Sequence, residues 1–207
     1  MLSILISSEY FATKPDLIID EFIGMFMAGM KTSQATLTNL IQYLCLNPTV
    51  KTRLLAEITP VLHEIKHDIR NNLEWEKIKD FEFTRNCFYE TLRIAPPAPM
   101  SGTLCFLKDT TIQNITFKAG MAFWLNFTAM HHWPSEWQSP DEFLPDRFDI
   151  SHHLFLRPDN TKRNPLAFTP FLGGKRICLG KNFAETAVRT AIPLLLFHFD
   201  FEFANVD

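Results

Sequence analysis

The chain has 207 residues and carries 20 Lys and Arg against 23 Asp and Glu, a formal net charge of -3 at pH 7. Hydrophobic residues make up 46% and charged residues 21%, so the composition is that of a globular protein, neither disordered nor fibrous. The small negative charge gives no reason to expect nucleic acid as a partner, and no stretch reaches the roughly 20 apolar residues that span a bilayer.

Three helices are expected in the first half of the chain. Apolar and small residues recur at helical spacing over 16–44 and cover nearly all sides of its middle, so we expect this helix to be buried on most sides. A second helix begins at Pro48, because proline suits the first helical turn, and runs to about Ile65. A third helix over 81–94 ends at the proline run 95–99.

The second half mixes short strands, irregular chain and a final helix. The pattern over 101–124 is strand-like, with a turn between two strands at 118–120. The chain over 131–170 is proline-rich and irregular, and the last helix covers about 179–198. No linker or repeat divides the chain, so we expect residues 1–207 to form one mainly helical domain with a small β-sheet. The residues expected on the inward face of the last helix are Phe183, Ala187, Ile192, Leu195 and Leu196.

The sharpest local feature is a loop around Cys178, at the start of the last helix. The helix start favours a thiolate, and Phe171 can pack over the sulfur and shield it from water. Gly174 and Gly180 let the backbone approach a flat partner closely, while Arg176 offers a positive fork for a carboxylate. Together these features describe a seat for haem bound through sulfur.

Other interpretations of this loop fit less well. A phosphate-binding P-loop needs Ser or Thr after Gly-Lys, and here Arg176 follows Lys175. A cysteine phosphatase needs an arginine shortly after its cysteine, and 179–184 contains none. The four cysteines form no Cys-x-x-Cys pair, which excludes the usual zinc-finger and thioredoxin spacings and makes reduced thiols the simplest expectation. A structural cysteine on a glycine-rich turn is the remaining alternative.

The loop resembles the haem loop of the cytochrome P-450 family, F-x-x-G-x-R-x-C-x-G. The segment 137–148 also looks like the family's segment upstream of that loop, so the match is collinear. The resemblance implies the C-terminal portion of the cytochrome P-450 fold and the cofactor haem b (iron protoporphyrin IX). It makes Cys178 the metal ligand and Arg176 a propionate partner. The cofactor-binding positions of the motif are Phe171, Gly174, Arg176, Cys178 and Gly180.

Glu90 and Arg93 lie one turn apart on one face of the expected helix 81–94. In the family that the chain resembles this is the E-x-x-R motif, and Arg147 would complete a buried triad. A buried network of charges is costly unless every member is satisfied. The resemblance therefore implies a structural role for this network, in holding the scaffold of the cysteine loop.

The first helix carries a second candidate motif. Ala28 and Gly29 are small enough to leave room for a diatomic ligand, and the Thr32 hydroxyl can bond a preceding carbonyl and open the helix slightly. This resembles the family's oxygen-binding motif, in which the three residues would be catalytic; a tightly packed helix crossing is the alternative. Lys31 stands where the family usually has Asp or Glu, and an ammonium group cannot accept a proton.

The resemblance implies a haem-thiolate monooxygenase that inserts one oxygen atom from O2 into an apolar small-molecule substrate. Electrons would come from a flavoprotein reductase or a ferredoxin. The match covers only the C-terminal half of the family's domain, so we expect an N-terminal anchor, absent here, to hold a cytosol-facing protein at the endoplasmic reticulum membrane. The apolar faces of 22–30 and 190–199 would then be uncovered. Two alternatives remain open: another haem-thiolate enzyme, an isomerase or peroxygenase, or an inactive fragment unable to hold haem alone.

Overall fold

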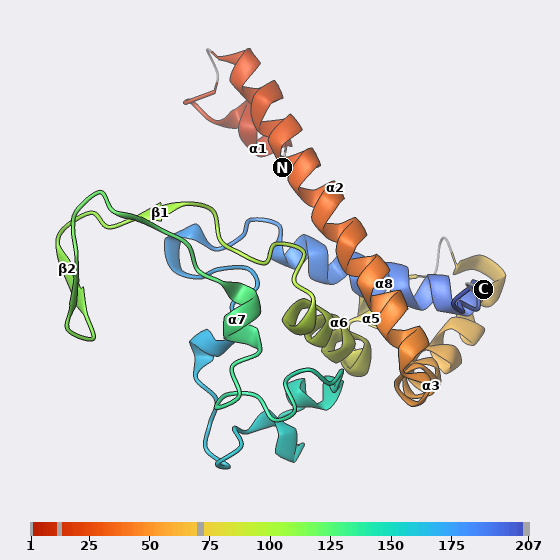
Figure 1. The fold of residues 1–207 in the computed structure, drawn as a ribbon. Coiled ribbons are helices and arrows are strands. Elements are labelled where there is room, and N and C mark those ends of the chain that lie inside the picture. Colours follow the sequence, from red (N-terminus) through yellow and green to blue (C-terminus); the bar gives the residue numbers. More distant parts are fainter. Residues whose placement is uncertain (1, 12–13, 70–72, 205–207) are drawn as a thin grey trace.

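The computed structural model describes residues 2–11, 14–69 and 73–204 and shows a mainly helical molecule with small antiparallel sheets (Figure 1). The expected fold class is therefore confirmed. The long helices gather around one core, while the short strands extend away from it as an arm. The helices of the described residues are α1 (Leu2–Ser7), α2 (Pro15–Leu46), α3 (Pro48–Ile65), the short 3-10 helix η1 (Lys66–Asp68), α5 (Trp75–Ile78), α6 (Glu82–Ile94), α7 (Phe127–His131) and α8 (Lys181–His198).

The core lies where four helices meet. α6 packs against α2, α3 and α8, and these helices also contact one another. Leu40 of α2, Ile58 of α3 and Ile192 of α8 are fully buried in one cluster with Phe88 of α6. Their apolar side chains recur at helical spacing, which is why this sequence folds locally as amphipathic helices. The helices expected over 16–44, 48–65, 81–94 and 179–198 are confirmed, with their ends shifted by at most two residues.

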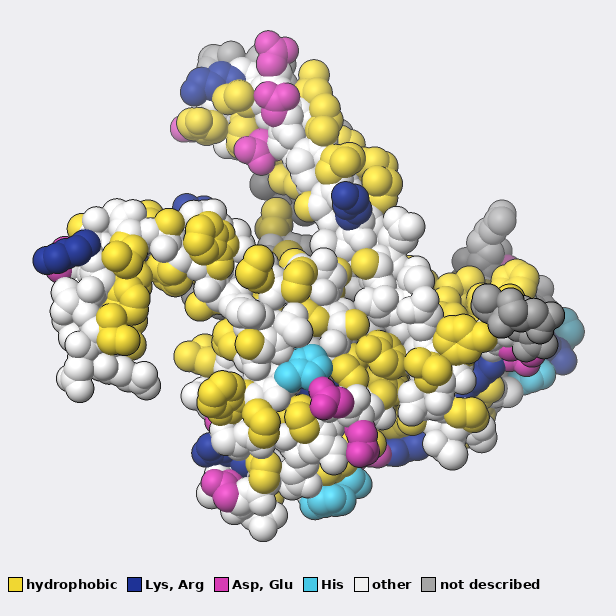
Figure 2. All heavy atoms as spheres, in the orientation of Figure 1, with side chains coloured by type: hydrophobic (Ala, Val, Ile, Leu, Met, Phe, Trp, Pro, Cys, Tyr) yellow, Lys and Arg dark blue, Asp and Glu magenta, His cyan; other side chains and the backbone are white. Residues whose placement is uncertain are grey.

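The first half of α2 is exposed, so the expectation of a helix buried on most sides is wrong. Phe22 is 50% exposed and Phe26 is 60% exposed, whereas burial begins at Thr36. The reason is geometric, because this half projects beyond the other long helices with α1 beside it (Figure 1). Figure 2 shows hydrophobic side chains along the projecting half. This agrees with the separate expectation that the apolar face of 22–30 is uncovered. Neither α2 nor any other helix in the described ranges is apolar enough over sufficient length to cross a membrane.

The strands of the described residues form two small sheets in the arm. Gln113 and Asn114 make the tight turn of one hairpin, with φ angles of 48° and 67°, as a type I′ turn requires. The turn expected at 118–120 joins two strands that belong to different sheets. The antiparallel pairs are β1 (Leu104–Cys105) with β4 (Ala122–Phe123), and β2 (Thr110–Ile112) with β3 (Ile115–Phe117).

The chain between α7 and α8 is irregular, as expected for 131–170. Turns and short 3-10 helices hold it, and it wraps back onto α6. It therefore brings its side chains to α6, where Glu90 and Arg93 lie. The 3-10 helices are η2 (Pro145–Phe148), η3 (His153–Phe155), η4 (Pro165–Ala167) and η5 (Gly174–Arg176).

α8 buries the face that meets α3 and α6. Val188, Ile192 and Leu196 are buried there. Phe183 was expected on this face but is 67% exposed, because it lies in the first turn of α8, ahead of the buried stretch. The expectation that 190–199 would be uncovered is wrong for most of the stretch, because the neighbouring helices bury Ile192 and Leu196; only at its end is Phe199 61% exposed.

Candidate functional site

The candidate site is the loop that leads into α8 and carries Cys178. Backbone hydrogen bonds close it: the Cys178 N–H donates to the Phe171 carbonyl at 2.8 Å, and the Ile177 N–H donates to the Gly174 carbonyl at 3.3 Å. Gly174 has a φ of 63°, a left-handed conformation that side chains oppose. Nothing lies within 4 Å of the position that a Cβ would take. Glycine is thus required at 174 by backbone conformation, and the space beside it is open.

Leu172 adds a strained residue to the same loop. Its φ of 59° is left-handed, which costs a bulky residue on the order of 1–3 kcal/mol. The Leu172 N–H donates to the Thr169 carbonyl at 3.0 Å, which helps to hold the turn. A leucine carries no sequence signal for this conformation, so the position was not foreseen. Such strain persists only where the surrounding structure over-determines the backbone.

Cys178 presents its side chain to the surface of the molecule. It is exposed, so the expected cover from Phe171 is wrong; Phe171 packs against the core, its ring 6.4 Å from that of Phe88. α8 begins at Lys181 with Gly180 as its N-cap, so Cys178 precedes the helix instead of starting it. A Cβ at Gly180 would lie 3.8 Å from the Cys178 sulfur, an ordinary contact. All four cysteines are free thiols.

Arg176 and the sulfur occupy the same exposed loop. Arg176 lies in η5, and its guanidinium makes no hydrogen bond or ion pair with another residue that the structure describes. An exposed thiol, an open glycine and an exposed guanidinium fit a flat partner that carries a metal and carboxylates. Within the described ranges, no group of three or more His, Cys, Asp or Glu is arranged to hold a metal ion.

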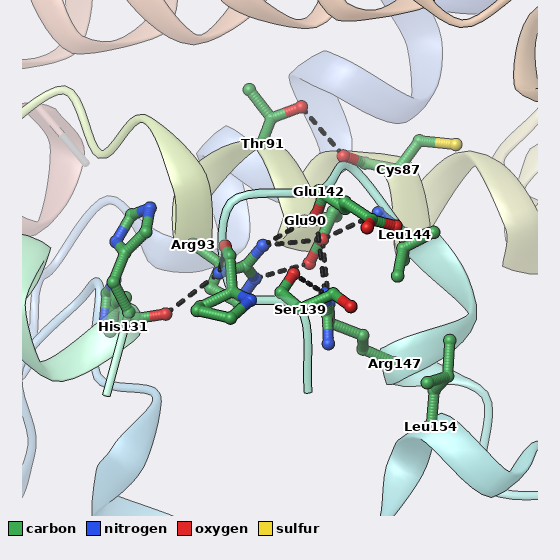
Figure 3. Close-up of polar contacts among 12 residues, drawn as sticks. Cys87, Glu90, Thr91, Arg93, His131, Ser139, Glu142, Leu144, Arg147 and Leu154 are labelled. Atoms are coloured by element: carbon green, nitrogen blue, oxygen red, sulfur yellow. Dashed lines mark hydrogen bonds and ion pairs between the residues drawn. The ribbon is translucent and has the colours of Figure 1, made fainter. Parts of the chain in front are cut away.

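Glu90, Arg93 and Arg147 meet in a buried ion-pair network (Figure 3). The Glu90 carboxylate accepts hydrogen bonds from Arg93 Nε and Nη2, each at 2.8 Å, which makes a bidentate pair. Arg147 Nε donates to Glu90 Oε1 at 3.0 Å, and the Leu144 N–H donates to the same oxygen at 2.8 Å. The three charged side chains are 0% exposed. The structure thus brings together the three residues that the sequence analysis grouped.

Backbone carbonyls supply the acceptors that one carboxylate cannot. Arg147 Nη1 has no partner among the described residues, and burial lowers the pKa of Arg147 while Glu90 opposes that change. These hydrogen bonds form only when 139–147 lies in one place against α6, so the network specifies that arrangement. The carbonyls that accept from Arg93 are those of His131 (2.9 Å), Pro140 (2.7 Å) and Glu142 (3.1 Å), and those that accept from Arg147 are Ser139 (2.7 Å) and Glu142 (3.4 Å).

A second layer around this network was missed from the sequence. The guanidinium carbon of Arg163 lies 3.9 Å from the centroid of the Trp137 ring. Arg163 also donates to the carbonyls of Glu136 at 3.2 Å and Leu154 at 2.8 Å. Burial lowers the pKa of Arg163 to about 10, with Arg147 adding to the effect. This arginine therefore ties the irregular chain together, and no local pattern signals that role.

The α2 motif lies on the projecting half of that helix. The Thr32 hydroxyl donates to the Ala28 carbonyl at 2.8 Å, the type of bond that the sequence analysis proposed. Ala28, Lys31 and Thr32 are exposed, and nothing lies within 4 Å of a Cβ built at Gly29. The alternative of a tightly packed helix crossing is therefore wrong for the described chain. No hydrogen bond or ion pair between described residues joins this motif to the cysteine loop.

A cavity of about 270 Å³ lies beside the loop and α6. Tyr89, Phe148 and Phe168 form its aromatic lining, and Phe171 brings the loop to it. The Tyr89 hydroxyl donates to Glu185 Oε2 at 2.9 Å, and burial raises the pKa of Tyr89. Cys178 is not among the lining residues. The cavity thus belongs to the packing next to the loop rather than to the sulfur.

Comparison with known proteins gives one family. A family model described as Cytochrome P450 matches residues 13–207. The chain is 33% identical over 178 residues to "Cytochrome P450 4X1" of Mus musculus, and 30% identical over 174 residues to "Cytochrome P450 4F12" of Homo sapiens. A plant relative, "Cytochrome P450 71D15" of Mentha piperita, is 30% identical over 180 residues.

These matches cover most of this chain but a minor part of each relative. They span 86%, 84% and 87% of the chain, in the order given, and 33%, 31% and 34% of the relatives. The chain therefore spans about a third of the length of the curated relatives that it matches.

Proposed function

The chain belongs to the cytochrome P450 family, and on that premise we propose that Cys178 binds haem iron through its sulfur. At the level of the family, the homologues imply a haem-thiolate monooxygenase. The observation that carries the proposal is the exposed Cys178 side chain on a loop tied by the 2.8 Å bond to the Phe171 carbonyl. A soft anionic sulfur held on a fixed backbone is the ligand that haem-thiolate proteins use.

The remaining motif residues are proposed to seat haem b around that sulfur. The exposed guanidinium of Arg176 suits a propionate, because its planar fork matches a carboxylate. Gly174 and Gly180 keep side chains away from a flat ring, and the open space beside Gly174 supports this. Phe171 acts through its backbone carbonyl, which holds the Cys178 N–H.

Glu90, Arg93 and Arg147 are proposed to act as a structural lock. They are buried, and Arg93 donates a hydrogen bond to the His131 carbonyl. The His131 ring in turn contacts Thr169, at the start of the loop. Their part would be to place the loop, with no contact to substrate. Removing one charged member of such a network leaves an uncompensated buried charge.

When bound, haem supplies the activation of O2, and the proposed reaction inserts one oxygen atom into an apolar organic substrate. Ala28, Gly29 and Thr32 are proposed to line the place of O2, with the Thr32 hydroxyl positioning water. The exposed apolar side chains of α2 support an apolar substrate. A flavoprotein reductase or ferredoxin as electron donor, and a cytosol-facing position at the endoplasmic reticulum membrane, belong to the same proposal and follow from the family.

A haem titration tests the proposal. The 207-residue chain, Cys178→Ser and Cys105→Ser are titrated with haem and followed by the Soret absorbance. Cys105 is the matched control, because it is also exposed but lies in β1 of the arm. We expect a thiolate-type spectrum from the parent and from Cys105→Ser, and its loss in Cys178→Ser. The same spectrum from all three proteins would overturn the assignment, and no binding by any would favour a fragment unable to hold haem alone.

Lys31 favours a second candidate, a haem-thiolate isomerase or peroxygenase. Lys31 precedes Thr32 in the sequence, and an ammonium group cannot accept a proton, so delivery of protons to O2 would lack the acidic residue usual in the family. The test compares oxidation of an apolar fluorogenic ether driven by reductase and NADPH with oxidation driven by peroxide. Turnover with peroxide alone, and a gain of reductase-driven turnover in Lys31→Glu, would favour the second candidate.

A further inference from the structure

His131 connects the buried ion-pair network to the cysteine loop. It is the last residue of α7 and is 0% exposed. Its backbone carbonyl accepts a hydrogen bond from Arg93 Nη1 at 2.9 Å, a contact visible in Figure 3. Its ring Nε2 accepts a hydrogen bond from the Thr169 N–H at 3.2 Å. One residue therefore binds the network with its main chain and the start of the loop with its side chain.

Thr169 is where the backbone of the loop begins. Its carbonyl accepts from the Leu172 N–H at 3.0 Å, which holds the left-handed turn. Two residues beyond Thr169, the Phe171 carbonyl accepts from the Cys178 N–H at 2.8 Å. A displacement of the Thr169 peptide would therefore move both the strained turn and the carbonyl that holds the cysteine backbone.

The chemistry of the His131 ring is set by its partner. A backbone N–H can only donate, so Nε2 must be unprotonated and the neutral ring carries its proton on Nδ1. Burial opposes a charged ring, and the nearby Arg93 guanidinium opposes it as well. The ring lies against Phe127 and Phe168, with centroid distances of 6.0 Å and 5.2 Å, which restrict its rotation. The acceptor is thus both fixed in place and kept available.

We infer that His131 is a positioning residue that transmits the placement of the Glu90 network to the loop of Cys178. The inference rests on the proposed function, in which that loop presents its sulfur to a cofactor. A positioning role means that loss of the ring acceptor loosens the loop before it loosens the helical core. A histidine that only fills space would instead weaken loop and core together, because both would open through global unfolding.

Amide hydrogen exchange of the 207-residue chain separates these two roles without any cofactor. His131→Leu removes the acceptor and keeps apolar bulk, whereas His131→Gln carries an oxygen that reaches the place of Nε2. His132→Leu is the matched control, because His132 is half-buried, follows α7 directly as its C-cap, and has its ring Nδ1 2.8 Å from the Thr128 carbonyl. If His131→Leu does not fold, His131→Asn, whose shorter side chain does not reach Thr169, replaces it in the comparison.

In the variants that lack the acceptor, we expect the protection of the Thr169, Leu172 and Cys178 amides to fall about tenfold, the effect of one lost buried hydrogen bond. Protection of the Ile58 amide in α3 should stay as in the parent, and His131→Gln should restore the loop. Equal losses in loop and α3, or no rescue by glutamine, would overturn the positioning role. If amide protection falls in the loop but the parent chain binds no haem, the proposed function is overturned and the positioning role of His131 stands.

Discussion

Glu90 supplies the carboxylate that Arg93 and Arg147 share in the interior of the molecule. Glu90→Gln keeps the shape but leaves two buried guanidinium groups without a counter-charge, so we expect the free energy of unfolding to fall by about 3–5 kcal/mol. Urea denaturation measures this loss. Glu82→Gln on the same helix is the control, because Glu82 is 57% exposed and pairs with Arg85 and, at the longer distance of 4.0 Å, with Arg189; its effect should stay below about 1 kcal/mol. Equal losses in the two variants would contradict a buried lock.

We expect the buried His131 ring to make the free energy of unfolding depend on pH. Burial, and after it the charge of Arg93, lower the pKa of His131 from 6.5 to about 4, and His132 adds to this lowering. The backbone of Leu92 and Arg93 favours the charged ring and opposes part of the change. Between pH 4 and pH 6.5, the His131 ring therefore binds a proton in the unfolded chain but not in the folded chain. This contribution to stability, about 3 kcal/mol at most, is complete above pH 6.5 and is lost as the pH falls towards 4.

His131→Gln removes this titration and keeps an acceptor for the Thr169 N–H. Unfolding free energies of the parent and of His131→Gln, measured in urea at a series of pH values, should therefore diverge in slope below pH 6.5. The parent should lose stability more steeply on acidification. Parallel curves for the two proteins would show that the folded ring takes up a proton as readily as the unfolded one.

Some of these residue contacts are predictable from the sequence. Glu90 and Arg93 could be placed on one helix face because they are three residues apart, and the motif with Cys178 is local. The hydrogen bond between His131 and Thr169 joins residues 38 positions apart. No local spacing encodes such a contact, so the link between network and loop emerged only from the fold.

At the scale of elements, α6 receives its N-terminal cap from another helix. The Glu57 carboxylate of α3 accepts from the backbone N–H groups of Phe83 at 2.6 Å and Thr84 at 2.9 Å, and from the Thr84 hydroxyl at 2.7 Å. A carboxylate here satisfies free amides and opposes the positive end of the helix dipole. The cap thereby fixes the start of the helix whose other end carries the ion-pair network.

Glu57→Ala should lower the free energy of unfolding by about 2 kcal/mol, the upper range for loss of a helix cap. The exposed Glu64→Ala on the same helix serves as the control and should change it by less than about 0.5 kcal/mol. Chemical denaturation of both variants makes the comparison. A loss no larger for Glu57→Ala than for Glu64→Ala would show that α6 does not depend on this cap.

The limits of helices were predictable from sequence, but their burial was not. The spacing of apolar residues and the prolines predicted the ends of α2, α3, α6 and α8 to within two residues. The same spacing shows which face of a helix is apolar, yet it does not show which element covers that face. Hence Phe26 is exposed on the projecting half of α2, whereas Ile192 of α8 is fully buried.

At the scale of the whole molecule, we expect the projecting half of α2 to determine how the chain associates in solution. Ile19, Phe22, Ile23, Phe26, Met27 and Met30 form an exposed apolar face on this helix. Large exposed apolar patches favour association. We expect the 207-residue chain to self-associate with rising concentration and Phe22→Ser/Phe26→Ser to do so less, as measured by sedimentation velocity. Leu107→Ser is the control, because Leu107 is 92% exposed but lies between β1 and β2 in the sequence, and these strands belong to the arm. Equal association of all three proteins would exclude this face as the cause.

The proposal that Cys178 ligates haem iron is tested most directly by the reduced, carbon-monoxide difference spectrum of the haem-loaded chain beside Cys178→Ser. A thiolate ligand would shift the Soret band of the carbon-monoxide complex to the red. We expect the red-shifted band in the parent and its loss in Cys178→Ser. A red-shifted band that survives in Cys178→Ser, or an unshifted band in the parent, would contradict the assignment of Cys178 as the ligand.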